Sequence, residues 1–122
     1  MSGVAHAFAL ARAEQISPTA LAPYAKGIGG LLPDLIDDMA RRLGADDHAA
    51  DVSAIASTAA SMAHIIDAAE EHRIDADVLR AARAAALRAI SAGHGADDFS
   101  RMTQAYAEVE ASAARGVHVV SP

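Results

Sequence analysis

The sequence contains no cysteine and very few aromatic residues. Without cysteine, disulfides, thiolate zinc sites and a cysteine nucleophile are all excluded. Aromatic residues make up 3% of the 122 residues, the formal net charge is −6, and no cluster of basic residues exceeds Arg41 and Arg42. Phosphate contacts need concentrated positive charge, and single-strand binding needs aromatic stacking platforms. We therefore expect no nucleic-acid partner.

The sequence also lacks long apolar runs and metal-binding motifs. No apolar run approaches the ~20 residues that span a bilayer. No basic segment followed by an apolar core marks a signal peptide at the N-terminus. These features predict no membrane contact and, with the lack of cysteine, favour a cytoplasmic location. The histidines are scattered and no HExxH motif occurs, so we expect no metal site.

Alanine is the dominant residue type of the sequence. Apolar residues reach 52%, and alanine alone makes up roughly a quarter of the chain. Alanine is the strongest helix former, but its small side chain buries little area at about 25 cal/mol per Å². The length is that of one domain. The composition therefore predicts one Ala-rich helical domain with a thin core, which would gain stability from the surface of a partner.

The spacing of apolar residues predicts an all-α bundle of about five to six helices, because steps of three and four recur and no segment alternates like a strand. We expect a single domain over residues 1–116 and a tail over 117–122. The expected helices cover residues 3–15, 18–43 with a restart at Pro33, 51–72, 75–92 and 97–115.

Particular residues mark the expected helix ends and buried stripes. Ser17 followed by proline is a start signal, Asp97 is an expected N-cap, and Gly44 and Gly93 are expected stops. Val52 and Ile55 begin the apolar stripe of the helix 51–72, and Val78 belongs to the stripe of the helix 75–92.

The segment AGHGADDFSRM at residues 92–102 resembles the last characteristic loop of imine reductases and reductive aminases, which belong to the 6-phosphogluconate and β-hydroxyacid dehydrogenase superfamily. In the same order as in the family, ALARAE, LAPYAKGIGGLLP and MAHIIDAA at 9–14, 21–33 and 62–69 resemble the end of the long interdomain helix and two later helical segments. The resemblance implies a helical domain that intertwines with its copy in a homodimer. It also implies an active site between this domain and the nucleotide-binding domain of the other subunit.

The nucleotide-binding half of that family has no counterpart in this sequence. No strand precedes a glycine-rich turn, and the only glycine cluster, Gly27, Gly29 and Gly30, lies inside a helical pattern. The aspartate or tyrosine that donates a proton in the family would lie upstream of Met1. We therefore expect no cofactor, and no hydride chemistry by this chain alone.

Three residues are predicted as catalytic. His64 and Asp67 lie three apart on one helix and can face each other, so the carboxylate would orient the imidazole for acid–base work. His6 lies on the first helix, where the resemblance places the active-site helix. The alternative is that His64 and Asp67 belong to a solvated face.

The predicted substrate-binding residues are mostly apolar. Met62 and Ala63 match positions that face the substrate in the family, although Ala63 replaces a residue that is usually polar there. Acidic residues Asp34, Asp37 and Asp38 form either a solvated face or a wall for a cationic amine or iminium. The full predicted set is Tyr24, Ile28, Leu31, Leu32, Leu35, Met62, Ala63 and Ile66.

These observations predict a non-redox biosynthetic enzyme that works without NADPH. A cyclase or isomerase would hold a small apolar or imine-like intermediate in a pocket at the homodimer interface and act by positioning and acid–base catalysis. Two alternatives remain open. One is a ligand-binding and dimerisation module without catalysis, and the other is a fragment of an NADPH-dependent imine reductase.

Overall fold

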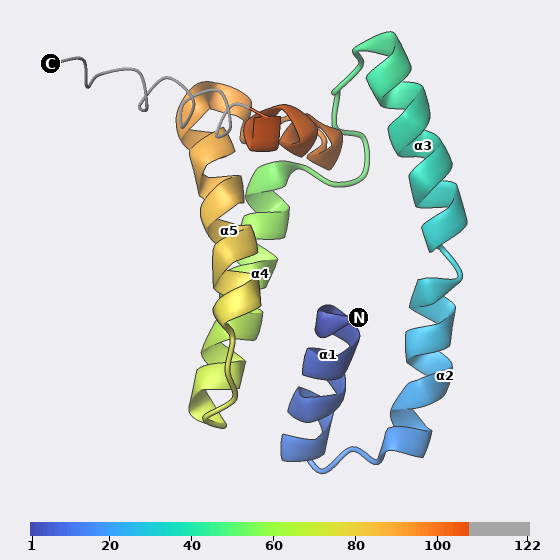
Figure 1. Cartoon of the computed structure of the whole chain (residues 1–122), viewed down its shortest axis with the longest axis vertical. Coiled ribbons are helices and arrows are strands. Elements are labelled where there is room, and N and C mark those ends of the chain that lie inside the picture. Colours follow the sequence, from blue (N-terminus) through green and yellow to red (C-terminus); the bar gives the residue numbers. More distant parts are fainter. Residues whose placement is uncertain (108–122) are drawn as a thin grey trace, which may run out of the picture.

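The computed structural model describes residues 1–107, which form an all-α bundle without strands (Figure 1). The predicted fold class is therefore confirmed. The expected end of the last helix near residue 115 and the tail at 117–122 lie outside the described residues. The elements are α1 (Ser2–Ala13), α2 (Pro18–Gly29), α3 (Leu32–Ala45), α4 (Ile55–Glu71), α5 (Asp77–Ala89), the π-helical turn η1 (Ile90–His94) and the 3₁₀ turn η2 (Phe99–Arg101).

Helices α4 and α5 pair as a hairpin that contains the larger of two buried clusters. The segment that includes η1 and η2 crosses one end of this hairpin (Figure 1). Most of the cluster is alanine, so the two helices pack through small side chains, as the composition predicts. Its buried members are Ile55, Ala59, Ala85, Ala86, Ala89 and Met102.

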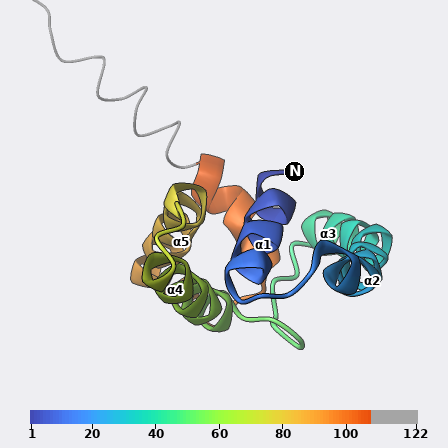
Figure 2. The ribbon, with the colours of Figure 1, turned by 90° about the horizontal axis from the view of Figure 1, so that it is seen from below.

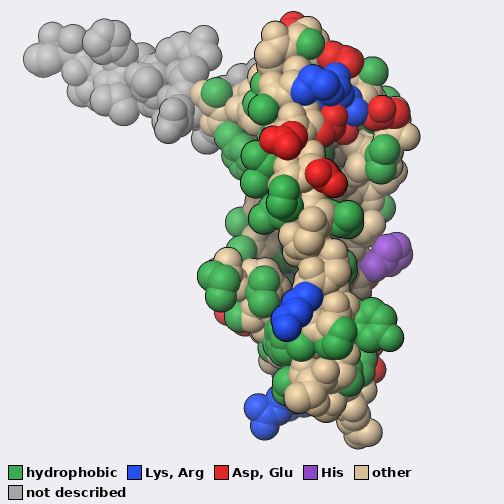
Figure 3. All heavy atoms as spheres, turned by 90° about the vertical axis from the view of Figure 1, so that its right-hand side faces the viewer, with side chains coloured by type: hydrophobic (Ala, Val, Ile, Leu, Met, Phe, Trp, Pro, Cys, Tyr) green, Lys and Arg blue, Asp and Glu red, His purple; other side chains and the backbone are tan. Residues whose placement is uncertain are grey.

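Helices α2 and α3 form a second unit, which we call the arm (residues 18–45). They follow each other along one side of the molecule, and α1 lies between the arm and the α4–α5 hairpin (Figures 1 and 2). Figure 3 looks onto the arm and shows hydrophobic side chains along it, with acidic and basic side chains gathered towards its upper end. None of the described helices is long and apolar enough to cross a membrane.

The start signals of the arm are confirmed, whereas its predicted stop is wrong. The Ser17 hydroxyl accepts a hydrogen bond from the Ala20 N–H at 3.2 Å, and Pro33 lies in the first turn of α3. Helix α3 continues through Gly44 to Ala45 and is capped by Asp46, whose φ is 50°. Aspartate tolerates the left-handed conformation better than most residues, so it supplies the cap in place of glycine.

Helix α4 begins at Ile55 rather than near Asp51. The N–H groups of Ile55 and Ala56 donate to the carbonyls of Asp97 and Gly95, each at 2.9 Å. The loop 94–98 thus caps α4. Because this loop lies far along the chain from Ile55, the local sequence does not reveal the cap. Val52 lies outside the helix and is 93% exposed, so its predicted place in the buried stripe is wrong.

The end of α5 and the start of the next helix also differ in detail from the prediction. Gly93 has a φ of 94°, which confirms it as the residue that ends this helical stretch. The regular α-helix stops at Ala89, however, and Val78 is exposed. Asp98 caps η2 by accepting from the Ser100 N–H at 2.9 Å, in place of the expected Asp97.

Candidate functional site

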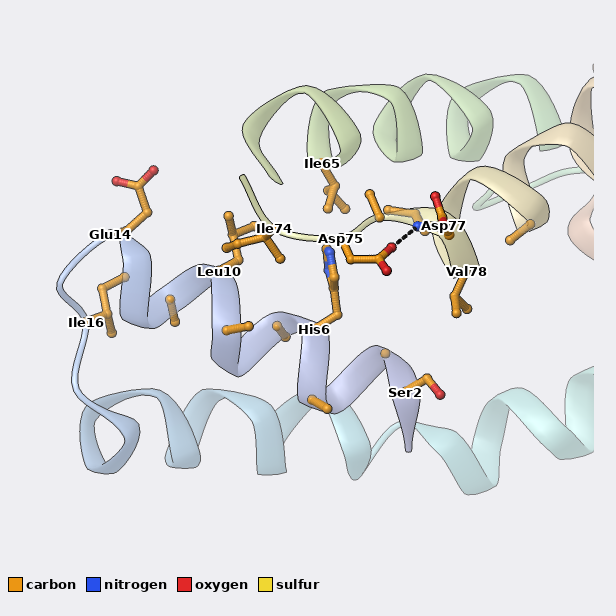
Figure 4. Close-up of a pocket in the computed structure, with 18 residues that line it drawn as sticks. Ser2, His6, Leu10, Glu14, Ile16, Ile65, Ile74, Asp75, Asp77 and Val78 are labelled. Carbon is orange, nitrogen blue, oxygen red and sulfur yellow. Dashed lines mark hydrogen bonds between the residues drawn. The ribbon is translucent and has the colours of Figure 1, made fainter. Parts of the chain in front are cut away.

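A pocket of about 890 Å³ lies between α1 and the connection from α4 to α5 (Figure 4). Its lining is mostly apolar, which suits a small organic ligand. Both sides contribute large aliphatic side chains, namely Leu10, Ile16, Ile65, Ile74, Val78 and Leu79. Ile74 and Leu79 also pack against the smaller buried cluster of Ile66, Ala69 and Ala76, which holds this wall in place.

The α1 wall leaves room for a ligand because its residues are small. Gly3, Ala5, Ala7 and Ala9 line the pocket. A Cβ added at Gly3 would have no neighbour within 4 Å, so the space beside this end of α1 is open. The alanine content that predicts a thin core thus also produces a cavity.

His6 is the polar residue of α1 that reaches into this pocket. Its Nε2 is buried and has no hydrogen-bond partner. In Figure 4 the imidazole ring points away from α1 towards the connection that contains Asp75. A buried polar atom without a partner costs free energy, so this nitrogen is suited to binding or proton exchange with a ligand.

Three carboxylates, Glu14, Asp75 and Asp77, also line the pocket. Glu14 lies 2.7 Å from the His72 Nε2, so it joins α1 to the end of α4. Asp77 accepts a hydrogen bond from Arg80 at 2.9 Å. The Asp75 Oδ1 accepts from the Asp77 N–H at 2.7 Å. This site therefore combines one imidazole with carboxylates on an apolar surface.

His6 is the predicted catalytic residue that lines the pocket, whereas His64 and Asp67 lie outside it. Both are exposed on α4, and no hydrogen bond joins them. The nearby Ser61 hydroxyl donates to the Ser57 carbonyl at 3.1 Å and so serves the helix backbone. The structure thus does not bring the imidazole of His64 and the carboxylate of Asp67 together.

The predicted substrate-binding residues lie outside this pocket. Met62 and Ala63 are partly buried on α4, and Ile66 belongs to the smaller buried cluster. The others are exposed on the arm, where Tyr24 is 75% and Leu35 is 60% exposed. Together with Ile36 they form what we call the arm face, which consists of Tyr24, Ile28, Leu31, Leu32, Leu35 and Ile36.

Sequence reasoning missed the wall formed by the α4–α5 connection. The position of Asp75 beside His6 depends on how α1 packs across the hairpin, which spacing within one helix does not predict. Ile65 also lines the pocket, although only its neighbours Met62, Ala63 and Ile66 were predicted to bind substrate. The signal that could have found this wall is the run of aliphatic residues around Asp75, at 74, 78 and 79.

A separate ionic network joins the arm to the loop before α4. Arg42 is buried and donates to Asp38 at 2.7 Å, to the Ala49 carbonyl at 2.6 Å, and to Asp51. Hydrogen bonds from Arg42, and secondarily from Arg41, hold the pKa of Asp38 below its usual range. The hydrogen bond from Arg42 likewise lowers the pKa of Asp51. The interactions of Arg42 and Asp38 show that part of the acidic cluster of α3 is structural.

Two further histidines have structural partners near η2. The His48 ring is buried, and its Nδ1 lies 2.7 Å from the Ser100 hydroxyl. His94 lies 2.9 Å from Asp97, which also accepts from Arg101. Burial raises the pKa of Asp97, but the hydrogen bonds from His94 and Arg101 outweigh that effect, and the pKa is lowered. Both contacts hold the loop that caps α4.

The described residues do not fit a dinucleotide or a metal ion. Gly27, Gly29 and Gly30 lie at the C-terminal end of α2, where the helix dipole is negative and repels a phosphate. Residues 1–107 contain no strand to precede such a turn. No three His, Asp or Glu side chains within this range are grouped as metal ligands would be.

A protein-family model matches the helical domain. The model of the NADPH-dependent reductive aminase-like C-terminal domain matches residues 1–108. Comparison with curated proteins gives no match.

Solved structures of imine reductases and reductive aminases resemble the chain. The imine reductase BcSIRED from Bacillus cereus BAG3X2 is 27% identical with a TM-score of 0.81, and the match covers 87% of this chain and 37% of that one. The imine reductase from Myxococcus stipitatus in complex with NADP+ is 26% identical with a TM-score of 0.78, over 84% and 38%. The reductive aminase from Aspergillus terreus in complex with NADPH and ethyl levulinate is 26% identical with a TM-score of 0.73, over 86% and 37%. The chain thus spans little more than a third of the length of these proteins.

Proposed function

The chain belongs to the family of NADPH-dependent reductive aminase-like C-terminal domains, and from this premise we propose that it is the substrate-side domain of an imine-reductase-type site. In this role it binds a small imine-like compound in the pocket between α1 and the α4–α5 connection. It also moves a proton to or from that compound. The observation that supports this proposal is the buried, unpartnered Nε2 of His6 inside an apolar pocket.

The proposed chemistry of His6 is acid–base. An imidazole changes protonation near neutral pH, so it can both take and return a proton. For a cyclic imine, the His6 Nε2 would remove a proton from the carbon next to the C=N group of the protonated imine. The electrons of that C–H bond form the C=C bond of an enamine, and the C=N electrons move to nitrogen. The apolar walls would hold the ring and exclude water.

Reduction of the imine would require hydride from a reduced nicotinamide, and a nucleotide-binding domain would have to hold that cofactor, since the described residues do not fit a dinucleotide. The relatives solved in complex with NADP+ or NADPH support this role for a longer protein. The second candidate is the non-redox cyclase or isomerase, in which proton transfer and positioning are the whole reaction. The placement of His6 favours it, because the groups that this reaction needs lie within the chain.

We further propose that the chain acts as a homodimer. The arm face exposes six large apolar side chains on consecutive helices, and monomeric proteins seldom leave such a patch uncovered. A second copy of the chain offers a matching apolar surface, and the thin alanine core would gain stability from this contact.

The test of the proposed function uses the cyclic imine 2-methyl-1-pyrroline. In D₂O, NMR would follow the exchange of its α-hydrogens for deuterium, with buffer alone as the baseline. We expect saturable acceleration by the protein and a loss of at least about tenfold for His6→Phe, since general bases contribute roughly 10²–10⁴-fold. His64→Phe tests whether His64 is the base instead of His6. Loss of exchange in His64→Phe, with full exchange in His6→Phe, would show that His64 on α4 transfers the proton.

The two candidate reactions differ in what completes them. If the chain is the substrate half of a reductase, a separately produced nucleotide-binding domain of a related imine reductase should restore NADPH oxidation with the imine. If the chain is a non-redox enzyme, turnover should not respond to that domain. Absence of any imine binding to the pocket would overturn both candidates.

A further inference from the structure

Among the carboxylates of the pocket, Asp75 is the one that no basic side chain of the described residues contacts. Glu14 is paired with His72, and Asp77 with Arg80. Asp75 makes no ion pair within residues 1–107, and its Oδ1 accepts only the Asp77 N–H. No lysine or arginine lines the pocket. The charge of Asp75 is therefore the least compensated at this site.

The backbone fixes the position of Asp75 at the pocket wall. The hydrogen bond from the Asp77 N–H to the Asp75 Oδ1 closes an Asx turn just before α5, so the carboxylate is held rather than free to rotate. The next residue, Ala76, is buried and anchors the connection in the smaller cluster. Figure 4 shows the carboxylate on the side of the pocket towards which the His6 ring points. The second oxygen remains available to a ligand.

We propose that Asp75 gives this pocket selectivity for a cation, so that it takes a small protonated amine or iminium in preference to a neutral compound of the same shape. The proposal rests on the proposed function and assigns its charge recognition to one residue. The nitrogen of the ligand donates to Asp75, and its ring lies against Leu10, Ile74 and Leu79.

Charge distinguishes the two kinds of ligand at this residue. A hydrogen bond between a charged donor and a charged acceptor contributes more than a neutral one. Asp75 is exposed, so water and salt partly screen this attraction. No hydrogen bond within residues 1–107 joins the His6 Nε2 to the carboxylate.

The test compares cyclohexylamine, which is cationic at pH 7.5, with cyclohexanol, which has a similar shape and no charge. We expect the wild-type chain to bind the amine more tightly in NMR titrations. In Asp75→Asn this preference should fall by about three- to fivefold, the effect of one exposed ion pair. Asparagine keeps an Oδ1 that can accept the Asp77 N–H, so the turn is preserved. Glu71→Gln is the matched control and should retain the preference, because Glu71 is exposed at the end of α4 and does not line the pocket.

Salt provides a measurement that does not depend on a variant. Amine binding by the wild-type chain should weaken between 0.05 and 0.5 M NaCl, while binding of cyclohexanol should not. Equal binding of the two probes would overturn the role of Asp75 and leave the small-molecule pocket standing. Loss of the preference in Glu71→Gln with retention in Asp75→Asn would also overturn it. Binding of neither probe would overturn the proposed function together with this inference.

Discussion

The α4–α5 hairpin and the arm differ sharply in how they treat their large apolar side chains. Ile55 of α4 is fully buried among alanines and Met102, whereas Ile36 of α3 is 59% exposed. Helix α3 nevertheless has a clear apolar stripe in its sequence. The comparison teaches that an amphipathic pattern identifies a face to be covered, but not which surface covers it.

The difference follows from residue size. On the hairpin, alanines let two helices approach closely, and each buried methyl group finds a partner within the chain. On the arm face, the large apolar side chains are exposed instead of packed against another described element. The hairpin thus has a buried core within one chain, and the arm is suited to association.

Replacing one isoleucine in each region should show the difference in their contributions to stability. Ile55→Ala should lower the free energy of unfolding by about 2–5 kcal/mol, because it leaves a cavity in the larger cluster. Ile36→Ala should cost less than about 0.5 kcal/mol at concentrations where the chain is monomeric. Urea denaturation followed by circular dichroism measures both. Equal costs at low concentration would show that the arm face is already covered within one chain.

Charged residues introduced on the arm face should weaken association between copies of the chain. Leu32→Glu combined with Leu35→Glu should weaken the proposed homodimer at least about a hundredfold, since both carboxylates would be buried without partners. Light-scattering mass against concentration measures this, and Ala60→Glu on the exposed side of α4 is the control. A wild-type chain that stays monomeric at high concentration would contradict the dimer.

Acid should affect the junction between the two regions before it affects the hairpin core. The pKa values of Asp38 and Asp51 are lowered in the folded chain, because both accept hydrogen bonds from Arg42. A lowered folded pKa gives stability that is fully present above the unfolded value of about 3.9 and is lost as the pH falls below it. We expect the midpoint of urea unfolding to decrease as the pH falls below about 4. The decrease should be less steep in the double variant Asp38→Asn, Asp51→Asn. An unchanged acid slope in that double variant would remove the network from the explanation.

Local signals in the sequence were sufficient to predict most of the fold. The apolar periodicity predicts helices that the structure contains. Their ends are marked by local residues, namely Ser17 before proline, Pro33 and Gly93. The errors share one cause. Helix α4 starts where the distant loop 94–98 supplies carbonyl groups, and α3 ends where Asp46 adopts a left-handed conformation. Caps that depend on tertiary contacts or on a single backbone angle leave no periodic signal.

Less of the candidate site was predictable, because it is formed by elements far apart in the sequence. His6 was predicted because the resemblance places the active-site helix over its segment, and its placement in the pocket follows from the packing of α1 against the α4–α5 connection. The spacing of His64 and Asp67 is compatible with a contact, but spacing alone does not produce one. The roles of these residues, and those of Tyr24, Ile28, Leu31, Leu32, Leu35, Met62, Ala63 and Ile66 in binding substrate, stay predictions.

The smallest expected effect tests where the hairpin begins. Val52 and Ile55 are three residues apart, as neighbours on one helix face would be, yet Val52 is 93% exposed and Ile55 is 0% exposed. Val52→Ala should therefore change the free energy of unfolding by less than about 0.5 kcal/mol, against the several kcal/mol expected for Ile55→Ala. Urea denaturation of the two variants at the same low concentration measures this contrast. A cost above about 1 kcal/mol for Val52→Ala would mean that the buried stripe extends before Ile55, as the sequence pattern alone predicts.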